Sequence, residues 1–142
     1  MRWLPIFCSC CAAVVFGGCG QSGPKLYEVR GAVTYDGKPL TTGNVSLRAD
    51  RDNQTRHQPT GLIDARGNYR IYTTEKPGAP GGWYRVVVFA TEPLFDNGKV
   101  SPSLPKSIIP VRYNNVSTSP FSFEVKAKPA AGEYDLKLEA EK

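Results

Sequence analysis

The sequence predicts an all-β protein: an antiparallel sandwich of seven short strands with an immunoglobulin-like outline. Apolar and polar residues alternate with the period of two that half-buried strands show. Glycine, proline and aspartate turn signals separate the alternating segments, and no convincing amphipathic helix follows residue 25. Several short strands divided by regular turn signals are typical of such a sandwich.

The first half of the predicted domain supplies four strands. Residues 27–35 form the first, and Asp36-Gly37 then provides turn chemistry that permits positive φ. Residues 45–49 form the second strand, and the polar stretch 50–59 is expected to be a loop. Strands at residues 60–63 and 68–73 are expected to form a hairpin that turns through residues 64–67.

The second half supplies three strands. Residues 83–90, with the sequence WYRVVVFA, are apolar on both faces apart from Arg85. That pattern predicts a central strand that is covered on both sides. Strands at residues 121–125 and 134–138 complete the seven.

The N-terminus has the order of a secretory signal. Arg2 precedes an apolar run over residues 3–16, which is followed by two glycines and Cys19. The run is too short for a comfortable bilayer span, and Pro5 also argues against a permanent transmembrane helix. The stretch FGGC, residues 16–19, resembles the lipobox of bacterial lipoproteins, although Phe16 stands where that family usually has an aliphatic residue. A signal peptide removed without lipidation, or an uncleaved anchor, is the alternative.

The lipobox resemblance implies a division of the chain into three parts. Residues 1–18 are the signal peptide, residues 19–25 the lipidated cysteine and its tether, and residues 26–142 the β-sandwich domain. Residues 20–25 reach at most roughly 20 Å when extended, so the domain is expected near the membrane surface. The other cysteines, Cys8, Cys10 and Cys11, lie in the discarded part, which leaves no thiol for a disulfide or a cysteine metal site.

The charge of the chain gives no sign of a nucleic-acid partner. The formal net charge is +5, and its lysines, arginines and acids are interspersed without a basic run. We expect a mixed, solvated surface. The short tether also allows a weak attraction to anionic lipid headgroups.

No catalytic, cofactor or metal site is predicted. His57 is the only histidine and is expected to be a surface loop residue. Asp50, Asp52 and Asn53 place oxygen atoms close together as a calcium loop would, but Arg51 stands among them, so a polar turn is the favoured account.

Residues 91–120 are the least expected part of the domain. Their prolines, among them Pro93 and Pro110, are expected to exclude regular structure over much of the segment. The segment nevertheless carries apolar side chains that a linker seldom holds. These form a possible contact loop, unless they only close an end of the sandwich: Leu94, Phe95, Leu104, Ile108, Ile109 and Tyr113.

Three stretches resemble carboxypeptidase regulatory-like domains: VRGAVTYDGKPLTTGNVSL (residues 29–47), TGLIDARGNYRIYT (60–73) and GGWYRVVV after Pro80 (81–88). The resemblance implies a transthyretin-like or prealbumin-like seven-stranded sandwich. With the signal, the stretch IIPVRYNNVSTSPFSFEV (108–125) resembles the small lipoproteins of planctomycete-type bacteria that carry this domain. Because the regulatory domain is non-catalytic, the resemblance implies a binding or structural role and transfers no active-site residue.

The sequence therefore predicts a lipid-anchored module of the cell envelope, facing the periplasm or the exterior, with a non-catalytic structural or protein-interaction role. Its expected partners are the membrane, through acyl chains on Cys19, and another envelope protein or polymer. The alternative is an envelope binding protein for a small ligand or glycan that uses Trp83, Tyr84 or exposed loop aromatics. A hydrolase built on His57 is the least favoured class.

Overall fold

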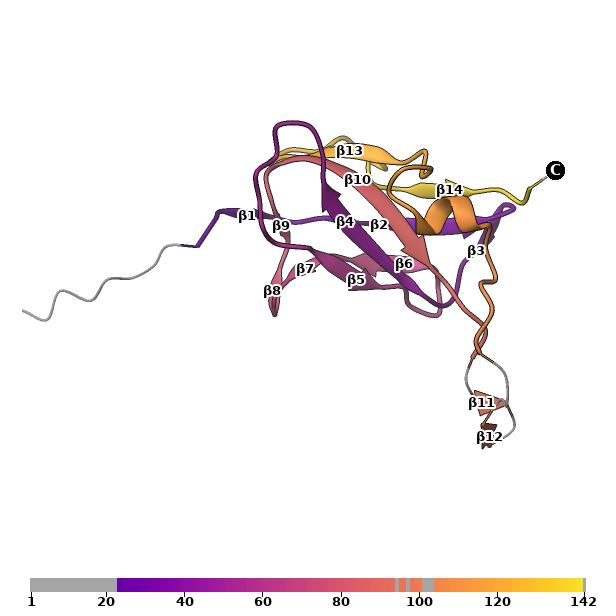
Figure 1. Cartoon of the computed structure of the whole chain (residues 1–142). Coiled ribbons are helices and arrows are strands. Elements are labelled where there is room, and N and C mark those ends of the chain that lie inside the picture. Colours follow the sequence, from indigo (N-terminus) through magenta and orange to yellow (C-terminus); the bar gives the residue numbers. More distant parts are fainter. Residues whose placement is uncertain (1–22, 94, 97, 101–103, 142) are drawn as a thin grey trace, which may run out of the picture.

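A computed structural model describes residues 23–93, 95–96, 98–100 and 104–141, which fold almost entirely as β-strands and their connections (Figure 1). The predicted signal peptide, Cys19 and Leu94 lie outside the described residues. In chain order the strands are β1 (Leu26–Tyr27), β2 (Arg30–Tyr35), β3 (Lys38–Pro39), β4 (Asn44–Ala49), β5 (Thr60–Leu62), β6 (Asn68–Arg70), β7 (Tyr72–Thr73), β8 (Lys76–Pro77), β9 (Ala79–Pro80), β10 (Gly82–Phe89), β11 (Phe95–Asp96), β12 (Lys99–Val100), β13 (Ser122–Val125) and β14 (Leu136–Leu138), and a short 3-10 helix, η1, covers Val111–Asn114.

Two larger sheets enclose the core. One has the order β13-β10-β4-β5-β7-β8, and the other contains β14, β2 and β3, with β6 paired to β2. The pairs β1–β9 and β11–β12 are small separate sheets. The fold is therefore all-β with several antiparallel sheets, an arrangement consistent with a β-sandwich.

Each of the seven segments predicted as strands contains at least one strand of the structure. The prediction of a central strand over residues 83–90 is confirmed, because β10 pairs with β4 on one side and with β13 on the other. Tyr84, Val86 and Val88 on this strand have no exposed surface. The strands that the sequence did not predict, β3, β8, β9, β11 and β12, have only two residues each.

Two parts of the predicted topology are wrong. The first predicted strand is broken at Glu28 and Val29, and its halves have different partners: β1 pairs with β9, whereas β2 pairs with β6 and β14. The sandwich is also not wholly antiparallel, because β14 runs parallel to β2 with Leu136 opposite Val33. Alternation of apolar residues identifies a strand and its buried face, but it does not encode the direction of the partner.

The second predicted hairpin strand, residues 68–73, belongs to both larger sheets. Its first part, β6, pairs with β2, and its last part, β7, pairs with β5. At the crossing point the backbones approach closely, because a Cβ on Gly61 would lie 2.1 Å from the carbonyl oxygen of Arg70. Only glycine leaves room for this approach, so Gly61 permits the crossing.

Residues 91–120 are more regular than predicted. The Glu92 amide donates to the Lys106 carbonyl (2.9 Å) and the Ile108 amide to the Ala90 carbonyl (3.0 Å), so the chain leaves and rejoins the body as a two-stranded arm that carries β11 and β12. Figure 1 shows this arm projecting from the end of the body opposite β1. Pro110 lies just before η1, a position where proline costs a helix no hydrogen bond.

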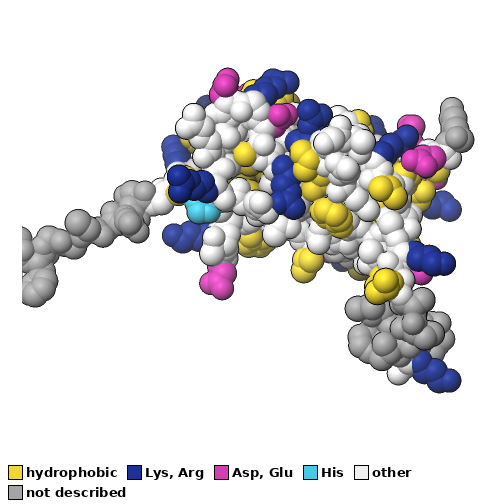
Figure 2. All heavy atoms as spheres, in the orientation of Figure 1, with side chains coloured by type: hydrophobic (Ala, Val, Ile, Leu, Met, Phe, Trp, Pro, Cys, Tyr) yellow, Lys and Arg dark blue, Asp and Glu magenta, His cyan; other side chains and the backbone are white. Residues whose placement is uncertain are grey.

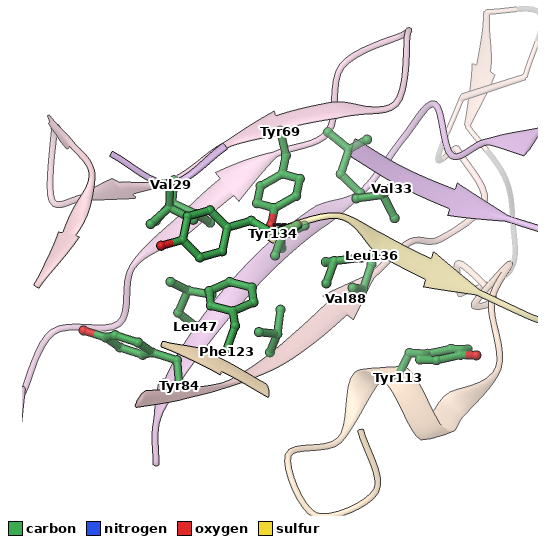
Figure 3. Close-up of a cluster of buried hydrophobic side chains, with 14 of the residues drawn as sticks. Val29, Val33, Leu47, Tyr69, Tyr84, Val88, Tyr113, Phe123, Tyr134 and Leu136 are labelled. Atoms are coloured by element: carbon green, nitrogen blue, oxygen red, sulfur yellow. Dashed lines mark hydrogen bonds between the residues drawn. The ribbon is translucent and has the colours of Figure 1, made fainter. Parts of the chain in front are cut away.

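The core combines aliphatic side chains with buried tyrosines (Figure 3). The hydroxyls of these tyrosines have hydrogen-bond partners. The Tyr69 hydroxyl donates to the Tyr134 carbonyl (2.5 Å), and the Tyr134 hydroxyl donates to the Glu124 carbonyl (3.2 Å). Burial raises the pKa of Tyr69, so its hydroxyl remains a donor at any physiological pH. The first bond connects β6 to the residues before β14 within one sheet, and the second connects that sheet to β13 of the other sheet.

Candidate functional site

The structure separates the residues of the possible contact loop. Ile109 and Tyr113 are buried in the core, so packing is the correct interpretation for both of them. Leu104 is 89% exposed and Ile108 is also exposed. Phe95 is placed by its backbone in β11. The predicted residues therefore do not form one binding surface.

Tyr113 connects η1 to the last strand of the sandwich. Its ring stacks on Phe121 with centroids 5.5 Å apart, and its hydroxyl accepts a hydrogen bond from the Glu139 amide (2.9 Å). The guanidinium of Arg112 also donates to this hydroxyl (2.9 Å). Tyr113 thus fastens the segment that follows the arm to the residues after β14.

Replacing Tyr113 with phenylalanine is expected to lower the free energy of unfolding by about 1–2 kcal/mol, because the Glu139 amide loses its partner while the ring packing remains. Urea unfolding measures the change. Tyr72→Phe is the matched control, since Tyr72 is an exposed tyrosine outside the core cluster and is expected to change stability by less than about 0.5 kcal/mol. Equal effects of the two substitutions would contradict this account of Tyr113.

A groove of about 870 Å³ lies beside the crossing point, where the chain passes from β6, which pairs with β2, to β7, which pairs with β5. We call it the β5–β6 groove. Its walls come from β2, β4, β5, β6 and β7, with Asp135 before β14 at one side. The groove exists because one strand serves both sheets, so its geometry follows directly from the crossing at Gly61.

Two apolar side chains stand exposed in the β5–β6 groove. Leu62 of β5 is 79% exposed, although its neighbours Gly61 and Ile63 are buried. Tyr72 of β7 is 40% exposed. Alternate residues of a strand point to opposite faces, so both side chains lie on the outer surface of the sheet, away from the core.

A small ion-pair network lines one side of the groove. The Arg70 guanidinium donates to the Glu28 carboxylate, and Arg30 lies 3.6 Å from the other oxygen of that carboxylate. The hydrogen bond from Arg70 lowers the pKa of Glu28, and the charge of Arg30 acts in the same direction. Two arginines of the lining thus share one carboxylate beside the groove, and the lining also contains Asp64 and Asp135.

The two acidic side chains that line the groove, Asp64 and Asp135, accept hydrogen bonds from backbone amides. One oxygen of Asp64 accepts from the amides of Asn68 (2.9 Å) and Arg66 (2.8 Å), and the bond from Asn68 contributes most to a lowered pKa of Asp64. Asp135 accepts from the Ala32 amide (2.8 Å). Asp64 thus fixes the turn before β6, and Asp135 connects the residues before β14 to β2.

The other polar residues singled out in the sequence form turns. In loop 50–59, Asp50 accepts from the Arg51 amide and lies 3.5 Å from Arg85, and Asn53 donates to the Trp83 carbonyl (2.9 Å). His57 is exposed in the same loop. Within the part of the chain that the structure describes, no three His, Cys, Asp or Glu side chains are grouped closely enough to hold a metal ion.

The two aromatic residues named for ligand binding differ in exposure. Tyr84 is fully buried and its hydroxyl donates to the Pro80 carbonyl (2.9 Å), so it is not available to a ligand. Trp83 is partly exposed, and the Arg51 guanidinium lies 3.9 Å from the centre of its ring system. Trp83 is therefore capped by a cation of its own chain.

Sequence reasoning did not identify the β5–β6 groove. Its apolar members, Leu62 and Tyr72, lie in segments that were correctly predicted as strands, but their pattern does not show that they face solvent. A leucine between Gly61 and Ile63 was the available signal, since one face of a surface strand is normally polar.

In comparisons with known proteins, no family model, no curated protein and no solved structure matches the chain. In the described residues no helix is both long and apolar enough to cross a bilayer.

Proposed function

We propose that this chain is a lipid-anchored module of the cell envelope that binds another envelope component without catalysing a reaction. The proposal includes a seven-stranded sandwich of the immunoglobulin or transthyretin type, in which the short strands β1 and β2, and likewise β6 and β7, each count as one interrupted strand. Its parts are an acylated Cys19, a short tether and a β-body that carries a contact surface.

The order of residues 1–19 supports the anchor. A charged residue, an apolar run, two glycines and a cysteine follow the order of a lipoprotein signal, with Phe16 at the position that is usually aliphatic. The first described strand, β1, begins at Leu26, only a few residues after Cys19. A domain attached this closely stays beside the membrane, where the partners it meets are other envelope components.

Leu62 is the observation that carries the binding role. A leucine that is 79% exposed in the middle of a folded domain gains nothing from the fold itself, and it lies beside a second exposed ring in a groove. Apolar and aromatic side chains in a concave surface with a charged wall are the features of a contact site for a protein. The partner that fits is an envelope protein that inserts an apolar side chain between Leu62 and Tyr72 and places a carboxylate near Arg30 and Arg70.

Tyr72 favours a second candidate, the binding of a small ligand or glycan. Its exposed ring lies beside the guanidinium of Arg70 and the amide of Asn68 in the same groove. The groove volume of about 870 Å³ is in the range of small-molecule sites. The ring would stack on the ligand and the polar groups would orient it.

A photo-cross-linking amino acid at position 62 tests the site in intact cells. We expect a recurrent protein adduct that is lost when Tyr72 is changed to alanine in the same chain. Position 38 is the matched control, because Lys38 is exposed on β3 outside the groove. Leu62→Asp should remove binding while changing stability by less than about 0.5 kcal/mol, since the side chain is exposed.

The class of adduct separates the candidates. If the adduct at position 62 is digested by glycosidase and no protein adduct is recovered, the result would support the glycan alternative. Identical adducts from positions 62 and 38, or adducts that persist with Tyr72→Ala, would show that the groove is not the contact site.

A further inference from the structure

Two aromatic rings at the end of the body where the described chain begins are each covered by a cation. Lys25 Nζ lies 5.4 Å from the centre of the Tyr27 ring, and the Arg51 guanidinium lies 3.9 Å from that of Trp83. Arg51 has a φ of 55°, a left-handed conformation that is uncommon for a residue other than glycine. The turn therefore directs this arginine over the indole at the expense of an ordinary backbone conformation.

The two pairs belong to one surface. A Cβ on Gly81 would lie 3.0 Å from the Tyr27 ring, and Trp83 follows two residues later at the start of β10. The Asn53 side chain fixes the loop to this place through the Trp83 carbonyl. We call this surface the tether end and define it by residues 23–27, 50–57, 74–78, 81–83 and 126–129.

The remaining segments join the tether end through backbone contacts. A Cβ on Gly78 would lie 2.5 Å from the Tyr27 carbonyl, and a Cβ on Gly81 would lie 3.4 Å from the Val125 carbonyl. Figure 2 shows several Lys and Arg side chains around the point where the described chain begins, beside the single histidine.

Most of the net positive charge of residues 19–142 is at the tether end. Its five segments contain six Lys and Arg against three Asp and Glu, whereas the rest of residues 19–142 contains eleven against ten. The tether end thus holds a net charge of +3 and the much larger remainder +1. Two ion pairs cross the boundary of the tether end, Asp50 with Arg85 (3.5 Å) and Lys126 with Glu133 (2.6 Å). The outside partners are one arginine and one glutamate, so including them leaves the net charge unchanged.

We propose that the tether end rests on the membrane surface and binds anionic phospholipid headgroups. This inference depends on the proposed lipid anchor at Cys19. Tryptophan and tyrosine beside lysine and arginine are the residues that anchor proteins at the headgroup level. Residues 20–25 reach at most roughly 20 Å, so the anchor brings this same end to the bilayer. The cations lie within reach of headgroup phosphates, and the β11–β12 arm extends from the opposite end, away from the membrane.

Trp83 provides a direct test, because Trp3 is the only other tryptophan and is removed with the signal. The acylated mature chain is inserted into vesicles of phosphatidylcholine, with or without phosphatidylglycerol. In vesicles with phosphatidylglycerol, we expect acrylamide quenching of Trp83 to fall to roughly half or less of its value in pure phosphatidylcholine vesicles. Brominated lipids should then quench Trp83 in the vesicles with phosphatidylglycerol. High salt should reverse the protection. The double variant K25Q/R51Q should lose it, and K38Q/K106Q, which removes the same charge away from the tether end, should keep it.

The outcomes separate this inference from the proposed anchor. A chain without acyl groups by mass spectrometry would contradict the anchor before any vesicle is used. An acylated chain that inserts into both vesicle types, but shows equal acrylamide quenching in both, would overturn the membrane-facing role of the tether end alone. Circular dichroism of both double variants establishes that they are folded. Equal loss of protection in K25Q/R51Q and K38Q/K106Q would also overturn the proposal, because it would reduce the effect to net charge.

Discussion

Replacing Gly61 with alanine is expected to lower the free energy of unfolding by about 3 kcal/mol, a large part of the stability of a domain of this size. The added Cβ would lie 2.1 Å from the carbonyl oxygen of Arg70 and 2.8 Å from its carbonyl carbon. These are backbone atoms, so no side-chain rotation relieves the contact. Either β5 or β6 must move, and each is held in a different sheet. Urea unfolding followed by circular dichroism measures the loss.

The chain offers a matched control for this substitution. Gly23 has no atom within 4 Å of an added Cβ and no positive φ, so Gly23→Ala is expected to leave stability unchanged. Gly61 also has no positive φ, which means that the expected effect at this site is steric rather than conformational. A loss below about 1 kcal/mol in Gly61→Ala would show that the sheets can separate at the crossing without breaking, and the account of the β5–β6 groove would then be wrong.

The central strand shows what the sequence could predict. Residues 83–90 read as apolar on both faces, and β10 is indeed the strand between β4 and β13. Periodicity carries this information because each strand must bury at least one face. The Asp64 turn was equally predictable: its carboxylate accepts from two backbone amides, which is the local chemistry of such turns.

The crossing of residues 68–73 between sheets could not be predicted in the same way. Buried and exposed residues alternate in β6 and β7 as expected for strands, yet the partners of these two strands lie in different sheets. Which sheet each strand joins depends on where β2 and β5 are placed in space. Gly61 resembles any other strand glycine until the Arg70 carbonyl is seen against it. The β5–β6 groove is a result of this tertiary arrangement. The leucine between Gly61 and Ile63 marks an unusual surface strand, but it does not show that Leu62 lines a groove.

The contact loop shows the opposite failure. Ile109 and Tyr113 were grouped with Leu104 because all lie in one proline-rich segment, but the arm and η1 send them to different environments. Apolar side chains in a long connection can be buried at its base and exposed farther out. Here the base closes the sandwich through Tyr113, while Leu104 remains in the arm.

Replacing Cys19 with serine is expected to reduce incorporation of labelled palmitate to background and to leave residues 1–18 attached. The lipobox resemblance implies that the acyl group is attached to the cysteine sulfur, and serine has a hydroxyl in place of that thiol. Cleavage of the signal is expected to follow acylation, so it should fail as well. Each buried methylene of an acyl chain contributes about 0.8 kcal/mol to membrane binding, so stable attachment by more than one chain is lost in a single step. Mass spectrometry of the N-terminus and fractionation of cells give the two readouts.

Cys11 supplies the internal control, because it is a cysteine of the same apolar segment that lies outside the FGGC stretch. Cys11→Ser should retain the label and the normal N-terminus, so a difference between the two variants assigns the acyl group to one sulfur. Palmitate retained in Cys19→Ser would contradict the proposed anchor. A wild-type N-terminus at any residue other than Cys19 would do the same. The short tether, of roughly 20 Å at most, and the membrane-facing tether end both depend on a mature chain that begins at Cys19.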